Sequence, residues 1–342
     1  MSAEPQVDVC PAAGASQPDA GRSSERAGDL ANRYGLLVLF VAVVALFSVL
    51  KPETFPTLEN AQTIASAQGV IALLALAATL PLIVGQFDVS IGFALGLSQT
   101  LCAGLMIKNG WSAVPAAAAG VASCIVIGAV NGLLVTKLRL NSFIATLGVG
   151  TVVLGLTQVY GNDETISGAL PASFTSLGQN QLLEIPLPFL YVAVVALVVW
   201  LAMEYTSWGR ECHATGGNPR AALLAGVRTE RVTFQCFVLA GLLSGVAGVL
   251  SVTILGAAAP TVGLGALLPA YAAAFLGATA FRPGRFNAAG TMLAIYLLAT
   301  GVTGLQSLGA KFYVEELFYG GALLIALAAS ALVERRRGIR AA

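Results

Sequence analysis

One acidic side chain stands between two long apolar stretches of the sequence. In the segment Leu80–Gly92, Pro81 and Gly85 precede Asp88, and Ser90 follows it. Pro81 loosens the end of one helix and Gly85 permits a tight turn, so Asp88 is predicted at the N-cap of the next helix. A carboxylate at such a break can contact or gate a polar solute. The alternative is a structural cap at a tight turn, since a carboxylate also satisfies free backbone N–H groups.

A second interruption lies in the later half of the chain. The segment Leu276–Thr291 contains Phe281-Arg282-Pro283-Gly284-Arg285-Phe286, followed by Asn287. It is typical of a tight turn between two helices, with Asn287 as a possible cap of the second. The two interruptions fall in corresponding parts of the two halves, which hints at an internal repeat.

Aromatic and neutral polar side chains could bind a sugar. Tyr271 and Phe275 are one helical turn apart and could stack on a sugar ring, or they could simply pack between helices. Asn131 and Thr146 lie within apolar stretches, where they could hydrogen-bond a polyol or hold two helices together. No apolar stretch holds an acid or base in its interior, which argues against a proton-coupled pump.

The sequence offers no catalytic, metal or nucleotide site. His213 is the only histidine, and the five cysteines are far apart, with no C-x-x-C. A phosphate-binding loop needs glycine before its lysine, and none of the four lysines has one. We therefore expect no enzymatic activity, no catalytic residues, no bound metal and no cofactor.

The composition requires a membrane. Of 342 residues, 57% are apolar and 10% are charged, against about 25% charged in a soluble domain; the mean hydropathy is +0.82. So few charges cannot cover the surface of a soluble protein of this size. A soluble enzyme, a nucleic-acid-binding protein and a disordered chain are excluded, and most of the surface must face lipid.

Nine stretches without charge predict ten membrane-spanning helices, because one of them is long enough for two. A span needs about 20 mostly apolar residues. Residues 232–281 are long enough for two spans, and Gly256–Gly265 supplies the break between them. Residues 165–183 are uncharged but turn-rich, and we predict a loop with a short helix there. The other eight spans are expected within residues 34–50, 60–87, 89–107, 109–136, 140–162, 185–203, 286–310 and 317–333.

The basic residues predict the orientation. With the N-terminus inside, 15 of the 18 Lys and Arg residues fall on the inner side, as the positive-inside rule requires. We therefore expect an all-α integral membrane protein, a polytopic bundle of about ten helices with both termini in the cytoplasm. Residues 1–33 are predicted to be a disordered cytoplasmic tail, residues 34–334 the transmembrane domain, and residues 335–342 a basic cytoplasmic tail.

One long inner loop, residues 207–230, contains helix signals. Residues 215–217 are predicted to form a flexible turn, Asn218 to cap, and Pro219 to occupy the first helical position. A short helix over residues 220–225 would end at Gly226. Such a helix cannot bury its apolar face alone, so it needs a partner protein or the membrane surface.

At this loop the sequence resembles a known family. Gly209-Arg210, Gly216-Gly217-Asn218-Pro219, Ala221-Ala222 and Gly226 resemble the coupling loop of permease subunits of ribose-type ABC importers, the monosaccharide-importing branch. The pattern Gly85-x-x-Asp88-x-Ser90-x-Gly92 and the segments 131–139 and 143–148 are similar to further stretches of that family. The sequence departs from it at Gln86, where glycine is usual, and in the turn 281–286.

The resemblance implies partners and a function. We expect a second permease copy, as a homodimer or a paralogous heterodimer, a cytoplasmic ATPase subunit that binds the ATP, and an extracytoplasmic solute-binding protein. The complex would sit in the lipid of a bacterial inner membrane and import a sugar or a similar small polar solute. The alternative is a stand-alone secondary transporter.

The resemblance and the residues above also indicate the sites. The residues expected to contact the ATPase are Gly209, Arg210, Gly216, Gly217, Asn218, Pro219, Arg220, Ala222 and Gly226. The candidates for the translocation path or its gate are Gly85, Asp88, Ser90, Asn131, Phe143, Thr146, Tyr271 and Phe275.

Overall fold

Helices make up nearly all of the molecule. The computed structural model describes the backbone of residues 20–341 and the side chains of residues 34–328. The tails predicted at residues 1–33 and 335–342 lie outside the described side chains. The helices that follow the predicted apolar stretches are α1 (Ala20–Leu50), α2 (Leu58–Ala67), α3 (Gly69–Ile83), α4 (Ser90–Ile107), α5 (Ala113–Thr136), α6 (Ser142–Gly161), α8 (Leu187–Tyr205), α11 (Thr229–Leu255), α12 (Val262–Gly277), α13 (Ala288–Ser307) and α14 (Tyr313–Ala341).

The connections contain the remaining elements. Three short helices are α7 (Ala172–Gln179), α9 (Ser207–Gly217) and α10 (Pro219–Leu224). The helix predicted in the loop 165–183 is therefore present as α7. Two small antiparallel sheets were not predicted. They pair β1 (Ile166–Ser167) with β4 (Ala257–Ala258), and β2 (Gln181–Leu182) with β3 (Ile185–Pro186).

The helical fold class is confirmed, while the count of ten spans stays a prediction. In the described part of the chain, α4, α5, α6, α8, α11 and α13 are long and apolar enough to cross a membrane. The pair α2 and α3, bent by 44° at Gln68, makes a seventh if it is one span. The segment Tyr34–Leu50 of α1, the part whose side chains are described, and the helix α12 are apolar but shorter.

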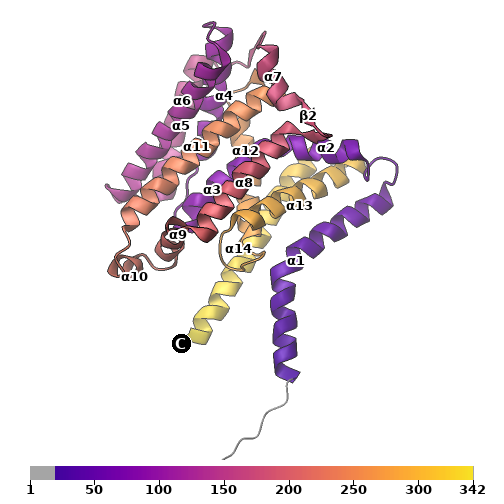
Figure 1. Cartoon of the computed structure of the whole chain (residues 1–342), viewed down its shortest axis with the longest axis vertical. Helices are drawn as coiled ribbons and strands as arrows, with labels where there is room; N and C mark the ends of the chain where they lie inside the picture. Colours follow the sequence, from indigo (N-terminus) through magenta and orange to yellow (C-terminus); the bar gives the residue numbers. More distant parts are fainter. Residues whose placement is uncertain (1–19, 342) are drawn as a thin grey trace, which may run out of the picture.

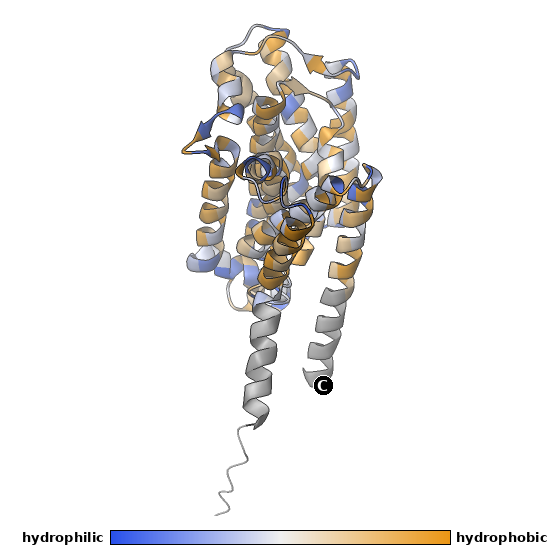
Figure 2. Cartoon of the chain, turned by 90° about the vertical axis from the view of Figure 1, so that its right-hand side faces the viewer, coloured by the Kyte–Doolittle hydropathy of each residue, from blue (hydrophilic) through white to orange (hydrophobic). Residues whose placement is uncertain are grey.

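Helix α3 lies in the core of the bundle. All its side chains from Ala72 to Ile83 are buried, and it packs against α4, α8, α11, α12 and α13. A helix that is apolar on every side has no face suited to water, so it is stable only where other helices or lipid surround it. Many large apolar side chains are also exposed on the outside of the bundle, and apolar residues predominate along its helices (Figure 2), as a lipid-facing surface requires.

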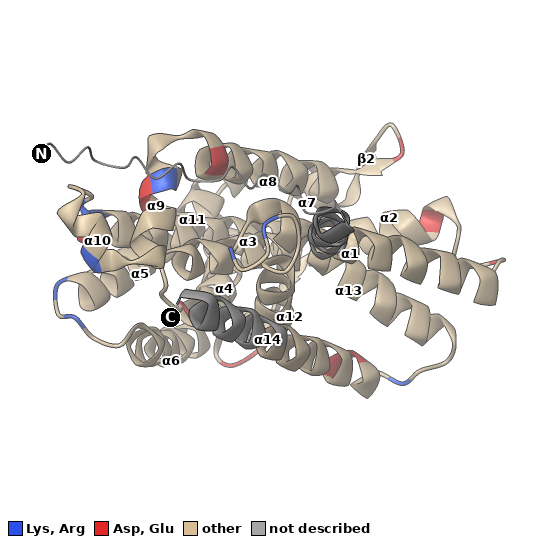
Figure 3. Cartoon of the chain, turned by 90° about the horizontal axis from the view of Figure 1, so that it is seen from below, with Lys and Arg blue, Asp and Glu red and all other residues tan. Residues whose placement is uncertain are grey.

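The two ends of the bundle differ in their elements and charges. The helices α9 and α10 lie at one end, and α7 and β2 lie toward the other (Figure 1). Lys and Arg residues gather around α9, α10 and the nearby end of α5 (Figure 3). This is the end that the distribution of basic residues predicts to be cytoplasmic.

Glycines bring α5 and α11 into backbone contact. A Cβ atom at Gly241 of α11 would lie 3.0 Å from the carbonyl carbon of Cys124 and 3.3 Å from the Cα atom of Gly128, both on α5. A Cβ atom at Gly248 would lie 2.6 Å from the Cβ atom of Ser98 on α4. The glycines Gly241 and Gly248 therefore allow α11 to pack closely against α5 and α4.

A glycine substitution tests this packing. We expect Gly241→Ala to lower the stability of the folded chain by about 1–3 kcal/mol, because the added methyl group overpacks the contact with Cys124. Thermal unfolding in detergent measures the effect. Gly155→Ala is the matched control, since a Cβ atom there meets nothing within 4 Å. Equal melting temperatures for the two variants would contradict the packing account.

Candidate functional site

A non-helical linker joins α3 to α4, with Val84 and Asp88 buried and Gly85 and Phe87 exposed. It covers residues 84–89, and Gly85 adopts a positive φ of 76°, a conformation that glycine adopts without a steric penalty. The turn predicted at Gly85 is therefore present. We call residues 84–89 the α3–α4 linker.

Hydroxyl groups from two other helices hold the α3–α4 linker. The N–H of Phe87 donates to Ser142 Oγ at 3.1 Å, and the N–H of Val89 donates to Thr146 Oγ1 at 3.0 Å; both acceptors lie on α6. The N–H of Asp88 donates to Tyr271 Oη of α12 at 3.2 Å. Three consecutive backbone donors thus depend on side chains and not on a helix or sheet, which leaves the linker's position to its neighbours.

The carboxylate of Asp88 belongs to a buried polar network that also includes Ser90 and Asn131. Asp88 is 1% exposed, and its Oδ1 accepts from the N–H and the Oγ of Ser90 at 3.0 and 2.6 Å. Asn131 Nδ2 donates to Ser90 Oγ at 2.6 Å. Asp88 satisfies an N-terminal N–H group of α4 as predicted, although Val89, and not Asp88, is the N-cap residue.

Two oxygen atoms of this network lack a donor. Asp88 Oδ2 and Asn131 Oδ1 are buried and have no hydrogen-bond partner within the described residues. Neither of the two ion pairs found among those residues involves Asp88. Buried acceptors without donors are costly, and the described residues supply no donor to either oxygen.

Aromatic rings surround the side chain of Phe87. Its ring centroid lies 6.2 Å from Tyr271 and 6.2 Å from Phe275, both nearly parallel, and 6.5 Å from Phe143 at a steep angle. Tyr271 and Phe275 therefore pack against another aromatic ring, as one of the two interpretations predicted. Such rings also suit the apolar faces of a sugar.

The candidates for the translocation path or its gate thus converge. Gly85, Asp88 and Ser90 belong to the α3–α4 linker and the start of α4, and the other five candidates come from α5, α6 and α12. Sequence reasoning missed Phe87 and Ser142. Phe87 stands directly before Asp88 and could have been noticed there, whereas no sequence signal marks Ser142 as a partner of the linker.

The altered turn 281–286 has structural partners. Arg282 forms an ion pair with Glu204 at the end of α8, and Phe286 packs against Phe275 at 5.3 Å. Asn287 Oδ1 accepts from the N–H of Gly290 at 2.7 Å and caps α13, which confirms the predicted cap. The turn therefore adjoins the aromatic rings at the α3–α4 linker.

The inner loop forms two helices, of which the sequence predicted one. Asn218 Oδ1 accepts from the N–H of Ala221 at 3.0 Å, α10 begins at Pro219, and Gly226 has a φ of 86°, all as predicted. The prediction of a flexible turn at residues 215–217 is wrong, because α9 continues through Gly217. Packing of α9 against α3, α8 and α11 overrides the low helix propensity of glycine.

Several loop residues face the bundle. Ala222 is buried, and a Cβ atom at Gly209 would lie 2.6 Å from the carbonyl oxygen of Ala202. Cys212 is buried, with its Sγ 3.8 Å from Cys236 Sγ of α11. These residues hold α9 and α10 on the bundle. Six of the residues expected to contact the ATPase are exposed: Arg210, Gly217, Asn218, Pro219, Arg220 and Gly226.

The tip of α10 is apolar and exposed. Leu224 is 89% exposed and Leu223 is 62% exposed, and the neighbouring Arg220 is also exposed. Sequence reasoning named Arg220 but missed both leucines. Leu223 and Leu224, with Arg220 beside them, form a small exposed apolar protrusion, which we call the knob on α10. Such a protrusion suits an apolar groove with acidic residues at its rim.

His213 of α9 is partly buried beside Arg285 and Glu204. Burial lowers the pKa of its imidazole, and the nearby Arg285 guanidinium lowers it further. The ring is therefore neutral at pH 7. In the described portion of the chain, no three His, Cys, Asp or Glu side chains are grouped as metal ligands would be.

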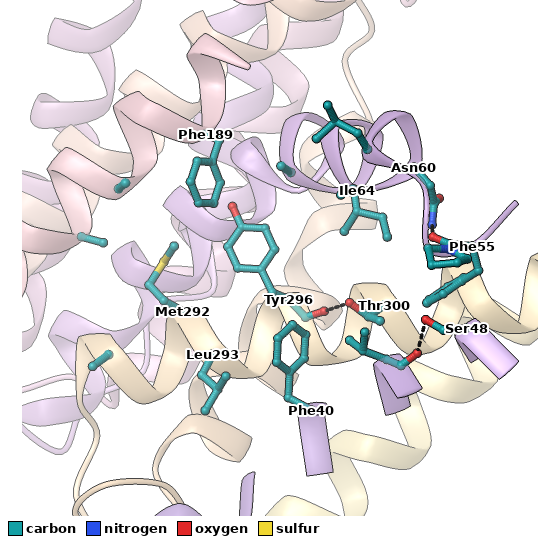
Figure 4. A pocket seen from close by; sticks show the side chains of 18 of the residues that line it. Phe40, Ser48, Phe55, Asn60, Ile64, Phe189, Met292, Leu293, Tyr296 and Thr300 are labelled. Carbon is teal, nitrogen blue, oxygen red and sulfur yellow. Dashed lines mark hydrogen bonds between the residues drawn. The ribbon is translucent and has the colours of Figure 1, made fainter. Parts of the chain in front are cut away.

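A mostly apolar cavity lies elsewhere. Its volume is about 990 Å³ and it lies between α1, α2, α8 and α13, and Phe40, Ile64, Phe189 and Leu293 are among the side chains that line it (Figure 4). Ser48 and Thr300 donate to carbonyl oxygens of their own helices. Tyr296 Oη also lines the cavity and is buried without a hydrogen-bond partner among the described residues. None of the residues that line the cavity is acidic, unlike Asp88 in the network described above.

Comparisons with known proteins give consistent matches. The family described as "Branched-chain amino acid transport system / permease component" matches residues 60–327. The ribose import permease of Bacillus subtilis is 35% identical over 88% of this chain and 92% of its own length. The D-allose transport system permease of Escherichia coli is 30% identical, over 89% and 93%. The L-arabinose ABC transporter permease of Azospirillum brasilense is 29% identical, over 91% and 92%. No solved structure matches the chain significantly.

Proposed function

The chain belongs to the branched-chain amino acid transport system / permease component family, and from this membership we propose that it is the membrane-spanning subunit of an ATP-binding cassette importer. It moves a sugar or a similar small polar solute across the membrane. The relatives named above are permeases for ribose, allose and arabinose. A stand-alone secondary transporter is not favoured, because those relatives span nearly the same length and are import-system permeases.

The candidate path favours a neutral hydroxylated solute over an amino acid. It offers two buried acceptors, Asp88 Oδ2 and Asn131 Oδ1, beside the ring of Phe87. Hydroxyl groups can donate to such acceptors while a sugar face lies on aromatic rings. An amino-acid carboxylate would need a cation, and no Lys or Arg among the described residues bonds to this network.

The energy source is a separate ATPase subunit that docks on the tip of α10. The exposed Leu223 and Leu224, with Arg220 beside them, are the observation that carries this assignment. A helix of six residues cannot cover these leucines itself, and at the predicted cytoplasmic end they would face water. The ATP is bound by that partner, so the chain itself needs no cofactor.

The remaining partners follow from the same proposal. The end with α7 and the β2–β3 hairpin faces an extracytoplasmic solute-binding protein. A second permease copy, identical or paralogous, completes the transmembrane unit in a bacterial inner membrane. Both termini are then cytoplasmic.

ATPase recruitment to vesicles tests the proposed function. Inside-out vesicles that contain the chain are expected to retain added cognate ATPase subunit, and right-side-out vesicles are expected not to. Vesicles without the chain are the control. Retention by right-side-out vesicles alone would reverse the orientation, and retention by neither would remove the assignment of α10.

A further inference from the structure

The end of α9 lies directly against the end of α3. A Cβ atom added at Gly216 would meet the carbonyl oxygen of Ile83, and it would lie 2.9 Å from the Ile83 carbonyl carbon and 3.3 Å from Val84 Cα. Two backbones therefore touch with no side chain between them. A contact of this kind has no flexible atoms to absorb a movement, since close-packed interiors transmit displacement.

Helix α9 is also joined almost directly to α10, the helix that we propose to dock on the ATPase. Only Asn218 separates Gly217 from Pro219, and its side chain caps α10. At the other end of α9, Thr206 Oγ1 accepts from the N–H of Gly209 at 3.2 Å, which fixes α9 on α8. A displacement of α10 is therefore transmitted to Gly216, because no flexible segment separates α10 from α9.

The far side of this contact is the α3–α4 linker. Ile83 is the last residue of α3, and the linker follows it at once. Its N–H groups at residues 87, 88 and 89 depend on three hydroxyl groups of α6 and α12. Hydrogen bonds of this kind can be exchanged without unfolding a helix, whereas those inside α3 and α4 cannot.

We propose that the Gly216–Ile83 contact carries the displacement of α10 to the α3–α4 linker, and that Gly216 is a positioning residue of the transport step. This inference rests on the proposed function. Movement of the linker shifts Phe87 relative to Tyr271 and Phe143, and this opens or closes the polar network around Asp88. The gate is thus driven through backbone contact and needs no charged relay.

The first test compares two glycines in the complete complex with ATPase and binding protein. Gly216→Ala forces α9 away from Ile83, whereas a Cβ atom at Gly155 of α6 meets nothing within 4 Å. The readout is the number of solute molecules imported per ATP hydrolysed. We expect this ratio to fall at least about fivefold in Gly216→Ala and to stay unchanged in Gly155→Ala. A loss of folding alone would lower uptake and hydrolysis together and leave the ratio intact.

The second test needs no substitution at the contact itself. A single reporter cysteine at Gln86, in a chain with Cys10 replaced by serine, is labelled with a thiol reagent; the four described native cysteines are buried. We expect the labelling rate to differ at least about fivefold between nucleotide-free complex and complex holding a non-hydrolysable ATP analogue. A reporter at Leu183, in the β2–β3 hairpin, should not change.

The outcomes separate the two proposals. If the unsubstituted complex shows no ATP-driven uptake, the proposed function fails. The relay through Gly216 is wrong, and the proposed function stands, in either of two cases. In the first, the unsubstituted complex transports and Gly216→Ala keeps the same number of solute molecules imported per ATP hydrolysed. In the second, the unsubstituted complex transports and the labelling rate at Gln86 does not change with nucleotide.

Discussion

Alanine in place of Asp88 is expected to reduce solute uptake by about 100-fold. The substitution removes the acceptor of two buried donors, the N–H and the Oγ of Ser90, and each unpaired donor costs about 1–3 kcal/mol. Together they amount to about 2–6 kcal/mol, a range that includes the roughly 2.8 kcal/mol of two factors of ten. Initial uptake rates in vesicles with matched amounts of assembled complex measure the effect.

Asparagine at the same position is the control. Asp88→Asn keeps an oxygen that can accept from Ser90 and is expected to retain more uptake than Asp88→Ala. The difference between the two variants reports how much of the role of Asp88 is hydrogen bonding. Uptake by Asp88→Ala within twofold of the unsubstituted complex would show that the network around Asp88 has no part in transport.

The second large effect is expected at the tip of α10. Leu224→Asp places a charge on a side chain that is 89% exposed and that we propose to enter an apolar groove of the ATPase. Burial of an unpaired carboxylate at the centre of an interface costs several kcal/mol, so affinity for the ATPase should fall by at least about 100-fold. Binding of the ATPase subunit to the purified chain measures it.

Leu183→Asp is the matched control for this variant. Leu183 is also 89% exposed, but it lies between β2 and β3, toward the opposite end of the bundle (Figure 1). We expect it to bind the ATPase normally. Normal binding by Leu224→Asp as well would show that the knob on α10 is not the docking element.

The sequence predicted features that depend on neighbouring residues. The cap at Asn218, the start of α10 at Pro219 and the cap at Asn287 are all encoded within three or four positions. The break at Gly85 is encoded in the same way, since its positive φ suits glycine alone. The separation of apolar and charged residues likewise predicts a helical membrane protein, and the structure confirms that class.

Features that depend on tertiary contact could not be predicted. The acceptor Ser142 is 55 residues from Phe87, and Tyr271 is 183 residues from Asp88, so local patterns do not pair them. The sequence Thr215-Gly216-Gly217 favours a turn by propensity, but packing of α9 on α3 and α11 makes it helical. The burial of Cys212 beside Cys236 follows from the same packing.

The most direct test of the central claim is solute accumulation in reconstituted vesicles. The account predicts that vesicles containing the chain, its ATPase and its binding protein accumulate solute against a gradient only when ATP is supplied on the side of α10. Vesicles containing the chain alone should accumulate none. Accumulation by the chain alone, without ATP, would contradict the account.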